Sequence, residues 1–488
     1  MASHVLIFSI FFPLLFGLTI YILGFEKKQR EIYTMAIVLV SSVCVYWLLA
    51  QGRVETVTLF KMTSAISIAF RIDNLSRVFA LLLASLWPIA TLYAFEYMEH
   101  EGRENTFFAL YTSCYGVTLG ICFAANLITM YLFYELLTLI TVPLIMHSRN
   151  EFSRPAGIKY IAYSIAGATS AFAGIMIIFT RSGGFDFAEG GILSPAAGQD
   201  PMVQLAFVLM FLGFGVKAAV FPLYEWLPAV GIAPTPVTAL LHAVAVVKSG
   251  CFAIMRVTYY IFGAGVMLGS FGQKLALFLT AFTIAFGSIM AYRETHFKRR
   301  LAMSTVANLS YILFGAMLMT PLGLIAACLH MLFHGVMKIC LFFVAGATHI
   351  KAHADYVTDL DGFGRKMPVT FAAFTVASLA LTGIPPFCGF YSKMYLGFAA
   401  VQLGSPLAYF GIAALLVSAL FTAIYLLSVC VRAYFPGKEF DYESIAEVED
   451  PSWKMKLPFI ILAVLCLVLG LMYGNAVDYV KDITTGLF

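Results

Sequence analysis

Charged residues are scarce in this sequence, since Asp, Glu, Lys and Arg together fill only 11% of its 488 positions. Soluble proteins average roughly 25% charged residues. Apolar residues fill 61% of the chain, which predicts a polytopic membrane protein with no separate soluble domain. The formal net charge of +4 at pH 7 is small and no basic stripe is present, so nucleic acid is excluded as a partner.

Signatures of catalysis and of processing are missing as well. The nine cysteines fall mostly in apolar runs and form no C-x-x-C pair, which favours core packing over a metal site or an iron–sulfur cluster. The chain contains no G-x-x-x-x-G-K-[ST] nucleotide loop and no recognisable flavin site, so we expect no cofactor in it. The first apolar run, Val5 to Leu23, lacks a basic leader and a cleavage site, and we expect it to be retained as a membrane helix.

Long apolar runs are what the sequence has in abundance. A helix needs about 20 apolar residues to cross a bilayer, and about fourteen such runs can be marked, which predicts an all-α polytopic fold. Two of them carry proline breaks, at Pro222 with Pro228 and at Pro385 with Pro386, and predict discontinuous helices. The runs lie near residues 4–24, 32–50, 75–95, 106–124, 126–147, 157–180, 203–222, 236–262, 274–292, 301–319, 322–347, 369–396, 405–432 and 456–474.

Lysine and arginine are distributed unevenly between the short loops. The odd-numbered loops are rich in them, with Lys27, Arg149, Arg299 and Lys438 among others, whereas the even-numbered loops are poorer. By the positive-inside rule the odd-numbered loops are cytoplasmic. An even number of helices would therefore place both termini on the outer side of the membrane.

Ionisable residues inside the apolar runs are few, and three of them lie on separate predicted helices. Glu135 lies centrally in its run, Lys217 precedes the first pair of prolines, and Lys248 follows in the next run. A glutamate and a lysine brought together in the bundle would lower each other's desolvation cost and shift each other's proton affinity. We expect a proton relay, because charges inside membranes are usually functional. A static ion pair that fixes helix register is the structural alternative.

A second cluster follows a four-residue spacing. His330, His334 and Lys338 recur every fourth residue and share one helix face over about 12 Å, a suitable length for a file of protonatable groups. Zinc binding by the two histidines is an alternative, but no H-E-x-x-H glutamate and no third ligand accompany them, so we expect no metal. Packing hydrogen bonds are a further alternative. His242 is an isolated membrane histidine, and Lys393 follows the second proline break.

These motifs occur in order from about residue 70 to 435, and together they resemble a known family. The family comprises the antiporter-like membrane subunits of respiratory complex I, membrane-bound hydrogenases and the Mrp sodium/proton antiporters. The resemblance rests on Tyr134-Glu135-Leu136, Val216 to Pro228, Ala233 to Lys248, Lys298 to Thr305, His330, His334, Lys338, and Gly362 to Lys393.

The resemblance implies a definite organisation. Family members have a fourteen-helix core with two inverted five-helix repeats, each containing a broken helix. Residues 1–100 would then form N-terminal membrane helices, 101–265 the first repeat and 270–435 the second, inverted repeat. Residues 436–488 would form a loop and the C-terminal membrane helix.

The resemblance also implies a function. The chain would move protons along a hydrated midplane series in which Glu135 pairs with Lys217, and Lys248, the histidine helix and Lys393 follow. Because the chain has no energy source of its own, we expect it to belong to a redox-driven complex, either a complex I-like dehydrogenase or a membrane-bound hydrogenase, in a prokaryotic cytoplasmic membrane.

The expected partners are other membrane subunits including antiporter-like paralogues, peripheral redox subunits, lipid, protons and possibly sodium. Two alternatives are open. One is a subunit of a Mrp antiporter, which exchanges sodium for protons with no electron donor. The other is a structural or quinone-binding membrane scaffold whose charges only fix helix packing.

Overall fold

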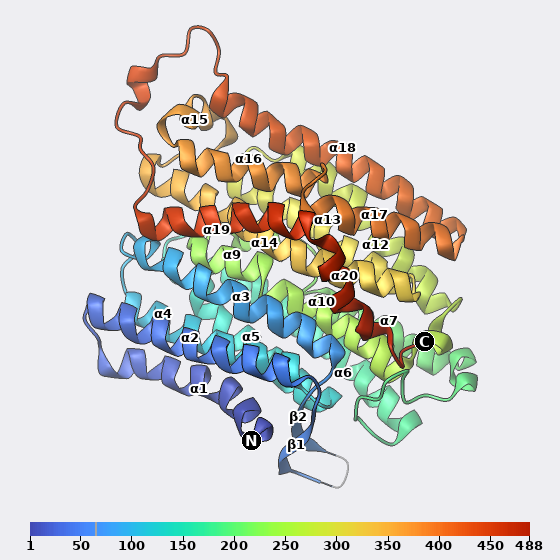
Figure 1. The fold of residues 1–488 in the computed structure, drawn as a ribbon. Coiled ribbons are helices and arrows are strands. Elements are labelled where there is room, and N and C mark those ends of the chain that lie inside the picture. The colour runs from blue at the N-terminus through green and yellow to red at the C-terminus, as the bar shows by residue number, and fades with distance from the viewer. Residues whose placement is uncertain (64–65) are drawn as a thin grey trace.

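The computed structural model describes residues 1–63 and 66–488, and most of its long helices lie side by side in one bundle (Figure 1). Helices from the N-terminal half form one side of the bundle and α18 lies at the opposite side. Within the described residues, eleven helical stretches are long and apolar enough to cross a membrane, and one of them, Thr235–Phe262, is the interrupted stretch described below. Two further apolar helices, α7 and α16, have only 15 residues each, so the count of fourteen spans stays a prediction.

The helices begin and end close to the predicted apolar runs. The N-terminal half contains α1 (Ala2–Leu23), α2 (Lys27–Gln51), α3 (Asn74–Tyr97), α4 (Glu104–Phe123), α5 (Leu127–Ile145), α6 (Ser153–Ser182), α7 (Pro201–Gly215), α8 (Trp226–Ala229), α9 (Thr235–Ala243) and α10 (Val246–Val257). The C-terminal half contains α11 (Ala264–Met267), α12 (Phe271–Arg293), α13 (Phe297–Met317), α14 (Pro321–Ala352), α15 (Phe363–Lys366), α16 (Pro368–Thr382), α17 (Cys388–Leu403), α18 (Pro406–Tyr434), α19 (Trp453–Leu471) and α20 (Tyr473–Lys481).

Polar caps fix where several of these helices start. The Asn126 side chain accepts a hydrogen bond from the Thr129 amide at the start of α5. Thr320 caps α14 and Ser405 caps α18 in the same way, and each is followed by proline at the first helical position. A side-chain oxygen satisfies an amide that the helix leaves free, and proline has no amide to satisfy, so both features favour initiation there.

A β-hairpin departs from the all-α expectation. Strands β1 (Val54–Lys61) and β2 (Ser67–Ile72) pair antiparallel, and Val54 lies opposite Ile72. The hairpin projects from the end of the bundle between α2 and α3 (Figure 1). The β-branched residues of this segment favour strand, and the segment is too short and too polar to count as a membrane run.

The first predicted discontinuous helix is confirmed. Helix α7 ends at Gly215, and the chain then turns through residues 216–225 before the short helix α8. Ala219 has a φ of 54°, and the Phe221–Pro222 peptide is cis. Lys217 therefore lies in the turn and not inside a helix as the sequence suggested, because Pro222 and the left-handed Ala219 prevent α7 from continuing.

The second predicted break is confirmed as well. Helix α16 ends at Thr382, its C-cap Gly383 has a φ of 94°, and α17 starts after the cis Pro385–Pro386 peptide. Gly389 in the first turn of α17 packs so closely against α16 that a Cβ atom would lie 1.9 Å from the Ala380 carbonyl oxygen. Glycine is thus required where the two halves meet.

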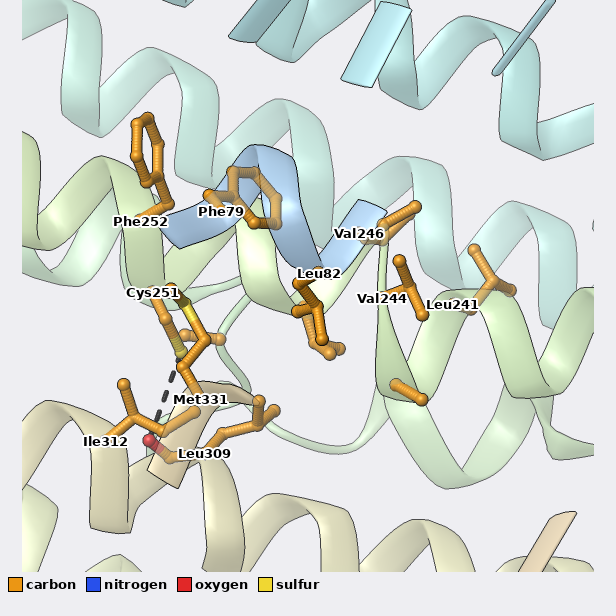
Figure 2. Close-up of a cluster of buried hydrophobic side chains, with 14 of the residues drawn as sticks. Phe79, Leu82, Leu241, Val244, Val246, Cys251, Phe252, Leu309, Ile312 and Met331 are labelled. Atoms are coloured by element: carbon orange, nitrogen blue, oxygen red, sulfur yellow. Dashed lines mark hydrogen bonds between the residues drawn. The ribbon is translucent and has the colours of Figure 1, made fainter. Parts of the chain in front are cut away.

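A third interruption departs from the sequence prediction. The predicted run 236–262 divides into α9 and α10, and Val244 between them has φ and ψ of −130° and −63°. The Ala245 amide bonds to the Leu240 carbonyl, five residues back, and a π-helical turn, Thr258–Phe262, follows α10. Phe79 and Leu82 of α3 enclose this break with side chains of α10, α13 and α14 (Figure 2).

Both termini lie at the same end of the bundle as the hairpin, and the α1–α2 and α18–α19 connections lie at the other end (Figure 1). The Asn74 side chain donates to the Asp482 carbonyl over 2.7 Å, and the Phe488 ring packs on Tyr259. The side of the membrane on which the termini lie stays a prediction, as does the inverted relation of the two repeats.

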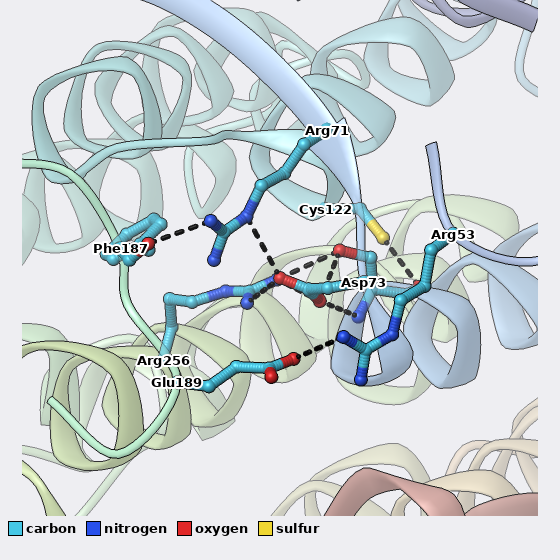
Figure 3. A network of polar contacts seen from close by, with 8 residues as sticks. Arg53, Arg71, Asp73, Cys122, Phe187, Glu189 and Arg256 are labelled. Carbon is cyan, nitrogen blue, oxygen red and sulfur yellow. Dashed lines mark hydrogen bonds and ion pairs between the residues drawn. The ribbon is translucent and has the colours of Figure 1, made fainter. Parts of the chain in front are cut away.

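A buried ion pair joins the hairpin end of α3 to α10 (Figure 3). Arg256 is fully buried and donates to both carboxylate oxygens of Asp73, over 2.5 Å and 3.0 Å, and to the Ser76 hydroxyl. Arg71 of β2 donates to the same carboxylate over 3.2 Å. Burial alone would raise the pKa of Asp73, but the two arginines and the Ser76 amide outweigh it and lower the pKa to about 2. Asp73 is therefore ionised at neutral pH, and it ties α10, α3 and the hairpin together.

Asp73→Asn should destabilise the protein strongly. Asparagine can still cap α3, but the substitution leaves the buried Arg256 without a counter-charge, which costs about 3 kcal/mol or more. The apparent midpoint of thermal unfolding in mild detergent should fall clearly below that of the unmodified chain.

The neighbouring Arg53–Glu189 pair supplies the control. Its side chains are 51% and 31% exposed, and Arg53→Gln should cost less than about 1 kcal/mol. Equal small shifts for Asp73→Asn and Arg53→Gln would contradict the anchoring role of Asp73.

Candidate functional site

Four lysines lie within the bundle at positions picked out by the sequence. Lys217, Lys248 and Lys338 are at most 1% exposed, and Lys393 is half-buried. A lysine ammonium that leaves water must recover hydrogen bonds or charge partners inside the protein. The acceptor that each lysine finds therefore indicates how its site is built.

Lys217 finds its acceptor on α5. Its Nζ donates to the Tyr134 carbonyl and lies 3.4 Å from the centroid of the Tyr134 ring. The neighbouring Glu135 is partly exposed, and its Oε1 atom is buried without a hydrogen-bond partner. Within the described residues no ion pair joins Glu135 to Lys217. Lys217 bonds to the backbone of Tyr134, and Glu135, its predicted partner, is the next residue along α5.

The turn that carries Lys217 packs closely against α10. A Cβ atom at Gly250 would lie 2.6 Å from the Ala218 amide nitrogen and 3.1 Å from the Lys217 Cβ. Only glycine permits this approach of the two backbones. This close approach places the Lys217 turn next to α10. Lys248 lies on the same helix, two residues before Gly250.

Lys248 and His334 form the closest pair of titratable groups in the site. Lys248 Nζ lies 2.6 Å from His334 Nδ1, and both residues are fully buried. A protonated lysine has no acceptor atom, so it must donate to Nδ1, which leaves the ring proton on Nε2. His334 Nε2 has no partner among the described residues. Lys248 and His334 thus share one proton between Nζ and Nδ1, and the N–H at His334 Nε2 is free to donate to another group.

His330 continues the series one turn away on α14. Its ring centroid lies 5.9 Å from that of His334. Its Nε2 contacts Asn308 Oδ1 at 3.2 Å, and its Nδ1 contacts Ser392 Oγ at 3.0 Å. The Asn308 amide nitrogen donates to the Ser304 carbonyl, which directs Oδ1 towards the histidine, so Nε2 carries the proton.

Ser392 has two possible acceptors for one hydroxyl hydrogen. Its Oγ lies 3.0 Å from His330 Nδ1 and 3.2 Å from the Gly389 carbonyl oxygen. With a neutral histidine the hydroxyl donates to Nδ1. With a charged histidine Nδ1 donates to Oγ, and the hydroxyl turns to Gly389. Ser392 can therefore accommodate both protonation states of His330.

Lys393 uses carbonyl groups that the second break leaves free. Its Nζ donates to the carbonyls of Leu381 and Thr382, over 2.6 Å and 3.0 Å, at the C-terminal end of α16. These carbonyls lack an intrahelical donor and carry the negative end of the helix dipole, which favours a cation. The Tyr311 ring lies 5.3 Å from Lys393 Nζ and stacks 5.1 Å from His330, so it occupies the space between them.

Two predicted residues lie beside this series. Lys338 donates to the Ser304 hydroxyl and lies 5.9 Å from the Phe342 ring. The His242 ring packs 4.8 Å from the same Phe342 ring. Neither His242 nitrogen has a hydrogen-bond partner among the described residues. Among the predicted residues the structure thus joins Lys248 to His334 and stacks His330 beside His334, while Lys338 contacts neutral side chains and His242 is held by packing.

Sequence reasoning missed the neutral residues that connect the charged ones. Ser304 and Asn308 lie four residues apart on α13, and Ser392 directly precedes Lys393. Their spacing on the helix was a usable signal, because two polar side chains on one face of an apolar helix need a polar partner. The part of the chain that the structure describes contains no group of three or more His, Cys, Asp and Glu side chains placed to hold a metal ion.

Two known protein families match this sequence. Residues 124–422, more than half of the chain, match the family described as "NADH:quinone oxidoreductase/Mrp antiporter, TM", and residues 60–108 match "NADH-Ubiquinone oxidoreductase (complex I), chain 5 N-terminus". The chain is 32% identical over 424 residues to NADH-quinone oxidoreductase subunit N of Desulforudis audaxviator (strain MP104C), covering 84% of this chain and 83% of that protein.

A relative of another kind is 29% identical over 416 residues. It belongs to a probable K(+)/H(+) antiporter of Rhizobium meliloti (strain 1021), and the match covers 84% of this chain but 41% of that longer protein.

Solved structures share the fold. A chain of the membrane-bound sulfane sulfur reductase, an archaeal respiratory membrane complex, has a TM-score of 0.87 at 22% identity, covering 99% of this chain and 97% of the other. A chain of the Mrp complex from Dietzia sp. DQ12-45-1b has a TM-score of 0.86 at 21% identity, covering 100% and 97%. The solved structures show only a shared fold, whereas the family match and the 32% identical relative show common family membership. The chain therefore belongs to the family of antiporter-like membrane subunits found in NADH:quinone oxidoreductases and Mrp antiporters.

Proposed function

We propose that this chain translocates protons as an antiporter-like subunit of a redox-driven membrane complex. The observation that carries the proposal is the 2.6 Å contact between Lys248 and His334, continued by His330 and Ser392 towards Lys393. Each group can take up or release a proton, or can reverse its hydrogen bond. Lys248 contacts His334 and His330 contacts Ser392 directly, and a short water bridge could span the 5.9 Å between the two histidine rings. Such a file needs no cofactor in this chain.

The two ends of the file differ in a way that suits transport. Lys217 and Glu135 lie at one end, where the buried series meets a partly exposed carboxylate, and Lys393 lies half-buried at the other. Neighbouring subunits can then exchange protons or electrostatic signals with either end. We therefore expect other membrane subunits as partners, as in the multi-subunit complexes to which the structural neighbours belong.

The redox-driven assignment is supported by the similarity to NADH-quinone oxidoreductase subunit N along most of both chains. The alternative, a cation/proton antiporter with no electron donor, is supported by the relative from Rhizobium meliloti. Purification of the tagged chain in mild detergent, followed by mass spectrometry of the co-purifying proteins, separates the two. Flavin or iron–sulfur subunits are the expected result. Small membrane subunits alone would overturn the redox assignment.

Lys248→Met should stop proton translocation while leaving the complex assembled. Methionine preserves the volume of the buried chain but cannot hold a proton, and loss of an acid–base group in a relay lowers the rate by about a hundredfold. The measurement is acidification of inverted vesicles, followed with a pH-sensitive dye and normalised to the amount of assembled complex.

Lys274→Met is the matched control, because Lys274 is exposed on α12. It should keep the full rate. If Lys248→Met also kept the full rate, the buried lysine would have only a structural role, as in the scaffold interpretation of the sequence.

Ser392→Ala tests the neutral link. Alanine leaves His330 Nδ1 without its contact and should lower the translocation rate by about tenfold, since a single relay group is removed but water can partly replace it. Ser378 is also fully buried, on the other half of the broken helix, and Ser378→Ala should have no effect. Equal rates for the two variants in the same vesicle assay would contradict a role of Ser392 in the relay.

A further inference from the structure

A cavity of about 780 Å³ opens at the end of the bundle opposite the termini, where α5 ends and α6 begins. Three arginines line it, Arg103 before α4 and Arg149 and Arg154 around the start of α6. All three are exposed. The cavity lies apart from the lysine and histidine file, and the proposed function makes no use of it.

The side chains of the three arginines are not paired with any acidic side chain of the described residues. Within residues 1–63 and 66–488, none of them makes an ion pair or a side-chain hydrogen bond, and Glu151 is the only acidic residue that lines the cavity. Other arginines at this end are paired, for example Arg432 with Asp361 over 3.1 Å. The cavity therefore carries an excess positive charge that the chain itself does not neutralise.

The surroundings of His147 show that this charge converges on the cavity. His147 also lines it, is 5% exposed, and donates to the Gly102 carbonyl over 2.9 Å. Burial lowers its pKa, and the charges of Arg103 and Arg149 lower it further, against the opposing effects of that hydrogen bond and of the Glu101 charge. His147 is thus neutral at physiological pH, and the arginines supply the positive charge.

Backbone geometry sets two of these arginines apart. Arg103 has a φ of 50° and Arg149 a φ of 51°, in the left-handed region that residues other than glycine rarely adopt. Strained positions of this kind concentrate at binding sites. Glycine would remove the strain at both positions, but it would also remove the two charges.

The cavity also has an apolar side. Val142, Pro143 and Met146 of the α5 end line it. One turn further along, Leu139 of α5 is 70% exposed and Ile158 of α6 is 54% exposed. An uncovered apolar strip on a membrane helix faces acyl chains or another membrane segment. The basic cavity therefore lies where a polar loop meets an apolar membrane face.

We propose that this cavity binds an anionic phospholipid, with its phosphate among Arg103, Arg149 and Arg154 and an acyl chain along the exposed strip of α5 and α6. The planar guanidinium group suits phosphate oxygens, and basic pockets between membrane helices are suited to anionic head groups. A phospholipid supplies charge at the cavity and apolar surface at the strip in one molecule, which free phosphate does not.

The test uses the full chain with its co-purifying subunits in nanodiscs made from equal parts of dioleoyl phosphatidylglycerol and dioleoyl phosphatidylcholine. Native mass spectrometry after release into detergent counts the lipids that stay bound. The unmodified protein should retain phosphatidylglycerol preferentially. The double variant Arg149→Gln with Arg154→Gln should lower this retention about tenfold, because it removes two of the three guanidinium groups that hold the phosphate.

The matched control is Lys28→Gln with Lys438→Gln, which removes two exposed charges from the same end of the bundle outside the cavity. It should retain phosphatidylglycerol like the unmodified protein. An equal loss in the control, or no preference for phosphatidylglycerol in the unmodified protein, would overturn the proposal.

Two further results would also overturn the lipid assignment. Displacement of phosphatidylglycerol by millimolar inorganic phosphate would identify a site for free phosphate. Loss of a neighbouring subunit from the Arg149→Gln, Arg154→Gln variant, with lipid retention unchanged, would identify a docking site for an acidic protein segment. The lipid preference of the unmodified protein requires no substitution and remains decisive if the double variant fails to assemble.

Discussion

The cost of holding a charge away from water governs this structure. Every buried cation requires an acceptor, and an uninterrupted apolar helix offers few, because its carbonyls already accept hydrogen bonds from its own amides. The breaks solve this problem. The end of α16 supplies two carbonyls to Lys393, and the turn after α7 frees the Lys217 backbone to approach α10 at Gly250. The broken helix and the buried lysine are therefore linked directly at Lys393, whereas Lys217 and Lys248 find their acceptors on α5 and α14.

The same constraint explains the contrast between the two polar clusters. Asp73 and Arg256 form a bidentate ion pair, and further donors also bind the carboxylate. Both groups are therefore stabilised in their charged forms. Lys248 and His334 are both bases, and a single proton between them satisfies the contact. The first arrangement fixes helices in place. The Lys248–His334 pair instead shares one proton. Lys248 lies on α10, the helix that the Asp73–Arg256 pair holds in place.

The sequence predicted the membrane class, the two proline breaks and the buried titratable residues Lys217, Lys248, His330, His334 and Lys338, because hydropathy, proline and intramembrane charge are strong local signals. It did not predict the hairpin, the interruption at Val244 or the absence of direct contact between Glu135 and Lys217. The interruption has no proline or glycine to mark it and depends on packing against α3, α13 and α14. Contacts such as that of Ser392 with His330 join residues 62 positions apart, and no local pattern specifies them.

The hydroxyl of Ser392 has a consequence for the tempo of the proposed relay. It has one hydrogen and two acceptors, His330 Nδ1 and the Gly389 carbonyl, and each passage leaves it pointing the other way. It must rotate back before the next proton can follow. The file would then pass one proton for each rotation of the hydroxyl. Its rate would level off at the rate of that rotation and would not keep rising with the proton gradient.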